Sequence, residues 1–361
     1  MRLTRLDALR GLAATSVVIF HYPSLLIPPG APLVLTGLPF LAVLEPFYTN
    51  GNYAVPFFWL LSGIVFYHNY AAQNVTLGSY FWRRVARLYP LHLVTLLAMA
   101  ALNLAFVGLV GFPAGPANDL PHFVLQLAMA TNWFVDFGHS FNYPIWSVSM
   151  ELIAYASFFL FLRFTSRGLL PLAAILAGAL TLALGFANYL ATAVALFFIG
   201  CVVARIGPRA PRSFAVSALI GGAGSVLAVA LSPWSRHVAL ATEYALFPAI
   251  LLAILKIDLS RPPLRREWIG NLSFGIYLMH IPLITVLRLL FALTGVNPAR
   301  EGWFLVVTML LVLGAAALSY RYLERPAQDA ILRWRGLKPP RSEASADPYI
   351  EIDQPERPAS A

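Results

Sequence analysis

The sequence predicts an all-α integral membrane protein with about ten transmembrane helices, and its composition is the first reason. Of the 361 residues, 59% are hydrophobic and 11% are charged, whereas soluble domains contain roughly 45–50% apolar and 25% charged residues. The mean hydropathy is +0.72. The second reason is that apolar runs recur along the chain, many of them near the length of about 20 residues that a transmembrane helix needs. A soluble globular protein is therefore excluded, and we expect the lipid bilayer as the surroundings.

Ten segments have the length and apolar character of membrane spans. They are 8–27, 54–70, 88–111, 145–163, 168–187, 189–204, 214–231, 238–256, 271–293 and 303–320. The first follows Arg2 and Arg5, as the core of a signal peptide would, but no small-residue cleavage site comes after it. We therefore expect this segment to be retained as the first helix.

Arginines set the expected orientation of these spans. All but two of the 25 lysines and arginines are arginine, and most lie between apolar segments, where basic residues mark cytoplasmic loops. The bias holds only if one further apolar patch, 121–135, does not cross the membrane. We therefore expect a re-entrant or surface helix there, both termini in the cytoplasm, and a multi-pass protein of the cytoplasmic (inner) membrane. No folded soluble part remains to bind nucleic acid, despite the net charge of +9.

We expect one membrane domain and one tail. The domain covers residues 1–335, and the polar, Pro-rich stretch 336–361 is typical of a disordered segment. The single cysteine, Cys201, excludes an internal disulfide or a cysteine metal cluster. No other pattern in the sequence predicts a metal site.

An arginine and a histidine in the first span are the first candidate functional residues. His21 follows Arg10 by eleven residues, which is about 16 Å along a helix and within about 20° of three full turns. The two side chains therefore share one face, with the guanidinium near the cytoplasmic surface and the imidazole within the bilayer. Ionisable groups at such depth usually face a protein cavity and indicate function. A neutral histidine bonded to a neighbouring helix is the alternative interpretation.

Three arginines stand at the cytoplasmic end of the third span. They are Arg83, Arg84 and Arg87, in "RRVARLYP". Arg84 and Arg87 are three residues apart on a helix, so their side chains can converge on one anion. Planar guanidinium groups suit phosphate oxygens. Simple anchoring of the helix at the membrane surface also explains these arginines.

Later spans carry further polar side chains. Ser147 and Glu151 are four residues apart on one predicted helix, and a carboxylate inside the membrane needs a partner. Tyr277 and His280 lie within about 60° of each other on another helix. Ser62 stands mid-span beside a glycine, where close helix packing is an equally good explanation.

Taken together, these stretches resemble the acyltransferase 3 family of bacterial integral-membrane acyltransferases, from about residue 3 to residue 330. Six elements occur in the family's order: Arg10 with His21, "FFWLLSG" at 57–63, "RRVARLYP", Trp146 with Ser147 and Glu151, "YLMH" ending at His280, and Glu324 with Pro326. Each element is weak alone, but six in order are specific.

The resemblance implies transfer of an acyl group, acetyl by default, from cytoplasmic acyl-CoA to a hydroxyl of a cell-surface or exported carbohydrate or glycoside. It implies no permanently bound cofactor, with acyl-CoA (acetyl-CoA by default) as donor substrate. The coenzyme A phosphates would lie against Arg84, Arg87 and Arg10 or Arg83. His21 would be the general base or, alternatively, the nucleophile that forms an acyl-histidine. The residues expected to complete the site are Glu151 as catalytic partner, with Ser62, Trp146, Ser147, Tyr277 and His280 as further polar pocket residues.

The chain departs from the family at one position. Members often carry an acidic residue just before the Phe-Phe of the second span, whereas this chain has Pro56. Glu45, Glu151 and Tyr53 are the candidates to take over that role. A proton-coupled transporter of a small polar solute would also place histidine and glutamate inside helices, but it does not account for six ordered elements.

Overall fold

The computed structural model of this chain is helical throughout the part that it describes. It describes residues 4–26, 34–73, 75–115, 117–133, 138, 140–184, 188–233, 237–256 and 267–339. No strand occurs among these residues, which confirms the predicted all-α class. Most of the predicted tail, 340–361, lies outside the described residues, as do Arg2 and the end of the 121–135 patch.

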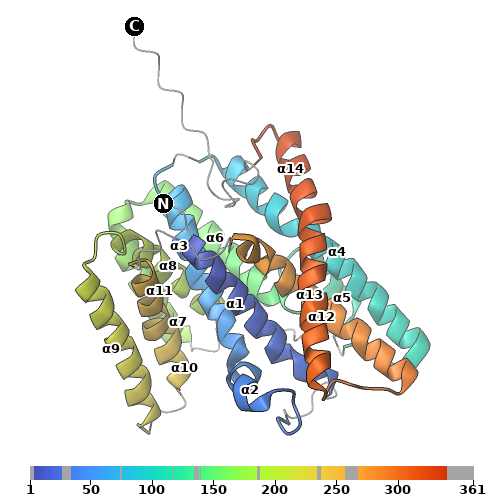
Figure 1. The fold of residues 1–361 in the computed structure, drawn as a ribbon. Coiled ribbons are helices and arrows are strands. Elements are labelled where there is room, and N and C mark those ends of the chain that lie inside the picture. Colours follow the sequence, from blue (N-terminus) through green and yellow to red (C-terminus); the bar gives the residue numbers. More distant parts are fainter. Residues whose placement is uncertain are drawn as a thin grey trace.

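Long helices run in both directions through one bundle (Figure 1). The α-helices are α1 (Thr4–His21), α2 (Leu41–Asn50), α3 (Ala54–Tyr70), α4 (Leu77–Val110), α5 (Leu120–Leu127), α6 (Ile145–Phe164), α7 (Leu170–Leu184), α8 (Tyr189–Ile206), α9 (Arg212–Ala230), α10 (Val238–Ala241), α11 (Phe247–Ile254), α12 (Glu267–Thr294), α13 (Gly302–Ser319) and α14 (Arg325–Trp334). Short 3₁₀ turns are η1 (Tyr22–Leu25), η2 (Gly51–Tyr53) and η3 (Arg167–Leu169), and π-helical turns are η5 (Thr242–Leu246) and η6 (Tyr320–Glu324).

Within the described residues, seven helical stretches are long and apolar enough to cross a membrane. They are Leu77–Val110, Ile145–Phe164, Arg167–Leu184, Tyr189–Ile206, Arg212–Ala230, Gly270–Thr294 and Gly302–Trp334. The other three predicted spans fall on α1, on α3 and on the shorter apolar helix Val238–Ile254, which η5 interrupts. The membrane-spanning class is confirmed, whereas ten spans and cytoplasmic termini remain predictions.

The ambiguous patch at 121–135 contains the short helix α5. Its eight residues extend about 12 Å, less than half of the roughly 30 Å hydrocarbon core. Asp119 caps the helix, because its carboxylate accepts the backbone N–H of His122 at 3.0 Å. The same hydrogen bond lowers the pKa of the Asp119 carboxyl. This geometry suits the predicted re-entrant or surface helix.

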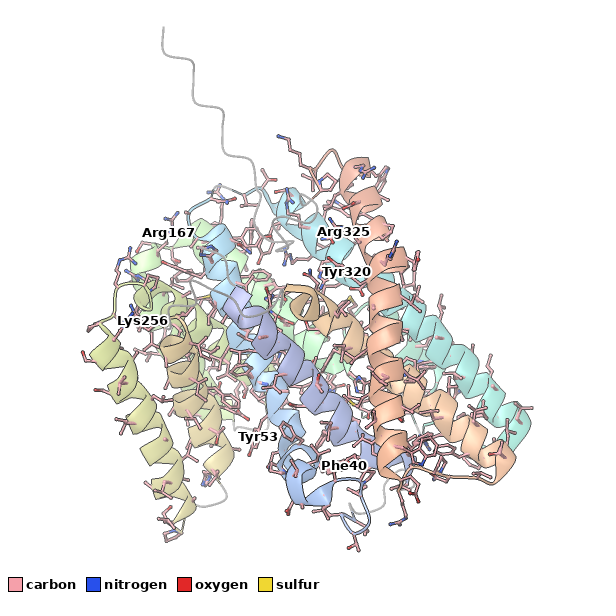
Figure 2. All side chains as sticks on the ribbon, in the orientation of Figure 1. Phe40, Tyr53, Arg167, Lys256, Tyr320 and Arg325 are labelled. Carbon is pink, nitrogen blue, oxygen red and sulfur yellow. The ribbon has the colours of Figure 1, made fainter. Side chains whose placement is uncertain are left out.

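The two ends of the bundle differ in charge. Arg167, Lys256 and Arg325 lie toward the end that also carries α14, and Phe40 and Tyr53 lie toward the other (Figure 2). We refer to these as the basic end and the opposite end. The positive-inside rule predicts that the basic end faces the cytoplasm.

Helices α3 and α8 cross at two glycines. A Cβ on Gly63 would lie 1.9 Å from the carbonyl oxygen of Phe197, and one on Gly200 would lie 2.1 Å from that of Leu60. The thiol of Cys201 donates to the carbonyl of Gly63 at 3.3 Å. Small residues allow membrane helices to approach closely and to gain van der Waals contact. This crossing fixes α3, which supplies one wall of the cavities described below.

Helix α1 packs along α12, and a third glycine allows that contact. A Cβ on Gly270 would lie 2.4 Å from the Cβ of Asp7. The contact holds the face of α1 that carries Arg10 and His21 against the polar residues of α12. The first span and the α12 residues predicted to line the pocket, far apart in sequence, thereby become neighbours.

We expect Gly63→Ala to destabilise the protein, because the added methyl has no room at the α3–α8 crossing. Overpacking of this kind costs about 1–3 kcal/mol. The measurement is the melting temperature of the purified protein in detergent. Gly178→Ala on α7 is the matched control, because its new Cβ meets no atom within 4 Å. Equal melting temperatures for the two variants would show that the crossing is looser than described.

Candidate functional site

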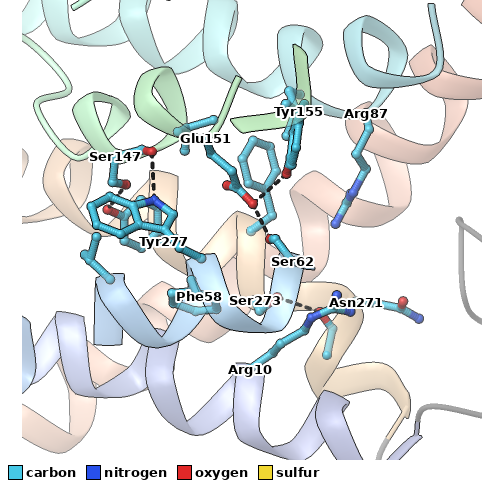
Figure 3. Close-up of a pocket in the computed structure, with 16 residues that line it drawn as sticks. Arg10, Phe58, Ser62, Arg87, Ser147, Glu151, Tyr155, Asn271, Ser273 and Tyr277 are labelled. Atoms are coloured by element: carbon cyan, nitrogen blue, oxygen red, sulfur yellow. Dashed lines mark hydrogen bonds between the residues drawn. The ribbon is translucent and has the colours of Figure 1, made fainter. Parts of the chain in front are cut away.

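One cavity lies between the first halves of α1, α4 and α12 and the helices α3 and α6 (Figure 3). Its volume is about 100 Å³. We refer to it as the arginine cavity. The polar and charged side chains that line it are Arg10, Ser62, Arg87, Ser147, Glu151, Tyr155, Asn271, Ser273 and Tyr277. Many of these residues are ones that the sequence predicted for the site.

Glu151 is the carboxylate of the arginine cavity. Its Oε1 accepts hydrogen bonds from the hydroxyl of Ser62 and from the hydroxyl of Tyr155, the latter at 2.6 Å. Figure 3 shows both bonds meeting at one oxygen of Glu151. Two hydroxyl donors are the kind of partner that a carboxylate at this depth needs. The predicted mid-span Ser62 therefore has a polar contact as well as a packing position.

Two guanidinium groups face the same cavity. Arg87 donates to Oε2 of Glu324 at 2.9 Å, and both side chains are nearly buried, with 10% and 1% of their surface exposed. Arg10 donates to Asp7 at 3.4 Å. Both guanidinium groups that line the cavity are therefore paired with a carboxylate.

Arg84 does not converge with Arg87, contrary to the expectation from their spacing. Its guanidinium turns into an aromatic cluster, donates to the hydroxyl of Tyr70 at 2.7 Å and lies 4.7 Å from the ring centroid of Phe66. The physical reason is that cation–π and hydroxyl contacts satisfy a buried guanidinium. Arg83 lies outside the cavity lining as well, and one of its nitrogens donates to the carbonyl of Lys338 at 3.4 Å.

A second, larger cavity of about 770 Å³ lies toward the opposite end. We refer to it as the histidine cavity. Its lining includes His21 from α1, Asn52 and Pro56 from η2 and α3, Trp146 from α6, Tyr189 and Thr192 from α8, and His237, Leu240 and Glu243 from the 237–246 segment. Aromatic rings and hydrogen-bonding groups therefore share its wall. The size falls within the range of about 300–1,000 Å³ that is usual for ligand sites.

His21 stands in a small polar cluster beside the histidine cavity. The hydroxyl of Tyr143 lies 2.9 Å from its Nδ1. The ring of His280 stacks on it, with centroids 5.2 Å apart and planes 20° apart. His280 itself is fully buried. The structure thus brings together His21, predicted as the catalytic base, and His280, predicted as a pocket residue, and the hydrogen bond between His21 and Tyr143 fixes the orientation of the His21 ring.

Tyr143 is a site residue that the sequence reasoning missed. It precedes the recognised Trp146–Glu151 element by three residues, in "NYPIW". The proximity of an aromatic hydroxyl to that element was a usable signal. Neither Glu45, exposed on α2, nor Glu151, in the arginine cavity, lines the histidine cavity with His21.

Glu243 was also missed. It lines the histidine cavity from the π-helical turn η5. A lone acidic residue inside the otherwise apolar segment 238–254 was the available signal, because such residues are costly in a membrane and usually functional. π-Helical turns also occur frequently at functional sites.

The two cavities share a wall made of Val55, Trp59 and Tyr277. The hydroxyl of Tyr277 lies 2.6 Å from the hydroxyl of Ser147 and donates to the carbonyl of Pro144 at 3.1 Å. Trp59 donates its indole N–H to the carbonyl of Ser147 at 3.2 Å. Trp146 continues this wall. Its ring lies edge-to-face with that of Trp59, with ring centroids 6.0 Å apart. A hydrogen-bonded partition therefore separates an arginine-lined cavity from a histidine-lined one.

Comparison with known proteins gives a family match and two relatives. The acyltransferase 3 model, described as an acyltransferase domain, matches residues 3–321. The acyltransferase MdmB of Streptomyces mycarofaciens is 34% identical over 122 residues, which are 33% of this chain and 30% of that protein. The peptidoglycan O-acetyltransferase OatA of Listeria monocytogenes is 25% identical over an alignment of 379 positions, covering 89% of this chain and 55% of that protein.

The chain therefore spans about half the length of OatA and matches less than a third of MdmB. No solved structure matches this chain.

We expect single cysteines in the two cavities to react from opposite sides of the membrane. Asn52→Cys, in the histidine cavity, should be labelled by an impermeant maleimide outside intact cells. Asn271→Cys, in the arginine cavity, should be labelled only in inverted vesicles. The natural Cys201 is buried and provides the unreactive background. Labelling of both positions from one side would contradict the arrangement of cavities and the predicted orientation.

Proposed function

Because this chain belongs to the acyltransferase 3 family, we propose that it transfers an acyl group, acetyl by default, from acyl-CoA to a hydroxyl of a carbohydrate or glycoside. The observation that carries the proposal is the pair of cavities with one shared wall. A donor that enters from the basic end and an acceptor that enters from the opposite end would meet at Val55, Trp59 and Tyr277. Each substrate would then reach the reaction site from its own side without crossing the membrane completely.

The arginine cavity suits the donor. Coenzyme A carries several phosphate charges, and Arg10 and Arg87, which line the cavity, would supply planar donors for phosphate oxygens. The volume of the cavity is only about 100 Å³, so the charged nucleotide would stay outside and only the pantetheine arm would enter. We assign Glu151 a positioning role here, because its carboxylate oxygens can accept the amide N–H groups of that arm. Ser62 and Tyr155 hold the carboxylate in place.

The histidine cavity suits a sugar-like acceptor. Trp146 and Tyr189 offer ring faces, with centroids 5.0 Å apart, against which the apolar face of a sugar can pack. Asn52, Thr192 and Glu243 offer hydrogen-bonding groups for its hydroxyls. The Listeria relative is named as a peptidoglycan O-acetyltransferase, and this name supports an acetyl group and a carbohydrate acceptor here.

In the proposed reaction, His21 is the general base. When its Nδ1 carries the proton and donates to the hydroxyl of Tyr143, Nε2 is the basic nitrogen. Nε2 takes the proton of the acceptor hydroxyl while the oxygen attacks the thioester carbonyl carbon. The carbon–sulfur bond then breaks, the acyl ester is formed, and the imidazolium returns its proton to the departing coenzyme A thiolate. If His21 attacks the thioester itself, the same cluster would hold an acyl-histidine.

We expect His21→Ala to abolish transfer while the protein remains inserted and folded. The purified wild-type protein should release coenzyme A from acyl-CoA, and the surface glycans of producing cells should gain ester-linked acyl groups. Both signals should fall at least a hundredfold in the variant, because general base catalysis contributes about 10²–10⁴. The measurements are thiol release and mass analysis of the glycans.

Two comparisons sharpen this test. His68→Ala removes an exposed histidine at the end of α3 and should leave turnover unchanged. Tyr143→Phe should lower kcat and alter its pH profile, because it removes the bond that orients His21. Normal turnover by His21→Ala would exclude His21 from the chemistry. No turnover by the wild-type protein would favour a transporter.

We expect Arg10→Lys with Arg87→Lys to weaken acyl-CoA affinity by roughly tenfold or more. Lysine keeps the charge but loses the planar fork. A charge-assisted hydrogen bond is worth about 1.5–3 kcal/mol, and 1.4 kcal/mol corresponds to tenfold. The measurement is competition binding of coenzyme A to the purified protein, while the KM for the acceptor should be unchanged.

Arg163→Lys with Arg321→Lys is the matched control, because both arginines are exposed and lie outside the cavity lining. An equal loss of affinity in this control would place the phosphates elsewhere on the basic end. Unchanged coenzyme A affinity in the double variant of Arg10 and Arg87 would show that these two arginines do not bind the donor.

A further inference from the structure

A third cavity lies at one corner of the basic end, away from the two already described. Its volume is about 690 Å³. The residues that line it are Tyr67, Arg167, Arg205, Ile206, Arg209, Ala210, Pro211 and Phe214. None of them lines the arginine cavity or the histidine cavity. We refer to it as the corner cavity, and the proposed acyl transfer does not use it.

Among the residues that the structure describes, three arginines and no carboxylate line the corner cavity. Arg205 donates to the carbonyl oxygens of Arg167 and Gly168 at 2.6 and 3.3 Å, which holds its guanidinium at the wall. Arg209 donates to the carbonyl of Arg205 at 3.0 Å. Backbone carbonyls satisfy some donors but do not neutralise the charge. The three guanidinium groups therefore form one positive surface.

A lysine adds to this positive corner. The ammonium of Lys256 donates to the carbonyl of Pro208 at 3.2 Å, in the loop that also carries Arg209. Figure 2 shows Arg167 and Lys256 at the same corner of the molecule. Clustered arginines at the membrane surface attract phosphate groups.

The corner cavity lies beside α9, a helix with much exposed apolar surface. Phe214, which lines the cavity, is 48% exposed, and Val216 and Ile220, on other faces of α9, are 55% and 68% exposed. In the segment of α9 that can span the membrane, only 11% of the residues are buried inside the protein. Lipid must therefore cover most of this helix. A cationic pocket at the membrane surface thus adjoins an acyl-chain surface.

We propose that the corner cavity binds an anionic phospholipid of the leaflet at the basic end. The phosphate headgroup would contact Arg167, Arg205 and Arg209, and an acyl chain would follow Phe214 and the exposed face of α9. Basic pockets between transmembrane helices at the cytoplasmic side have the chemistry that binds such headgroups. A free phosphate would meet the same guanidinium groups but would gain nothing from the apolar surface of α9. That difference favours a lipid as the source of the phosphate.

The test measures lipid binding to the full-length purified protein in detergent. Phosphatidylglycerol should bind in native mass spectrometry and raise the melting temperature, whereas phosphatidylcholine with the same acyl chains should do neither. Arg167→Gln with Arg209→Gln should lower the affinity for phosphatidylglycerol by about tenfold or more, since each basic residue contributes about 1 kcal/mol to anionic-lipid binding. This variant retains Arg205 and its two carbonyl contacts, so the fold of the corner should persist.

Arg321→Gln with Arg333→Gln is the matched control. It removes two exposed arginines from the other side of the basic end and should keep wild-type lipid affinity. Equal losses in the two double variants, or equal binding of phosphatidylcholine, would overturn the proposal. A rise in melting temperature with inorganic phosphate or soluble glycerophosphoglycerol as large as with the lipid would overturn the lipid as the source. A Phe214→Gln variant that lowers lipid binding but does not change the response to inorganic phosphate would support it.

Discussion

The need to keep charged groups away from lipid governs the arrangement of this bundle. A charged side chain at membrane depth is costly unless it faces the protein interior and finds a partner. Arg87 and Glu324 meet at 2.9 Å with almost no exposure, although they are far apart in sequence. The π-helical turn η6 carries Glu324, and helix α4 carries Arg87. Because loss of either partner would leave a buried charge unpaired, the contact fixes the C-terminal helices against α4.

The same constraint explains why the polar residues form a wall. Ser147, Tyr277 and Trp59 satisfy one another and nearby carbonyl groups. A buried hydroxyl or indole N–H without such a partner would destabilise the fold. The result is a partition between the arginine cavity and the histidine cavity. For an enzyme with substrates on two sides of a membrane, such a partition would let a thioester and a hydroxyl meet without opening a continuous aqueous path.

The sequence predicted the fold class because composition and apolar runs are averages over many residues. It also predicted that Glu151 and Ser62 belong to the site, and the structure joins them by a hydrogen bond. It predicted the direction of Arg84 wrongly. The helical spacing of Arg84 and Arg87 is correct, but Phe66 and Tyr70 of α3 and Tyr155 of α6 draw Arg84 away. Such a cluster depends on packing between distant helices, which local spacing does not encode.

The contact between Tyr143 and His21 also joins distant segments, so local spacing did not reveal it. This contact matters for the acidic residue that the chain lacks at position 56. Pro56 lines the histidine cavity and carries no ionisable group, and the hydroxyl of Tyr143 bonds to His21 instead. A carboxylate beside an imidazole both orients the ring and attracts its positive form, whereas a neutral hydroxyl orients the ring and attracts its positive form far less. In the proposed reaction the ring must return its proton to the leaving thiolate, and a neutral partner does not oppose that step. Proline at position 56 is therefore compatible with base catalysis by His21. The base needs a partner that holds its ring in the reactive orientation, and Tyr143 provides that partner.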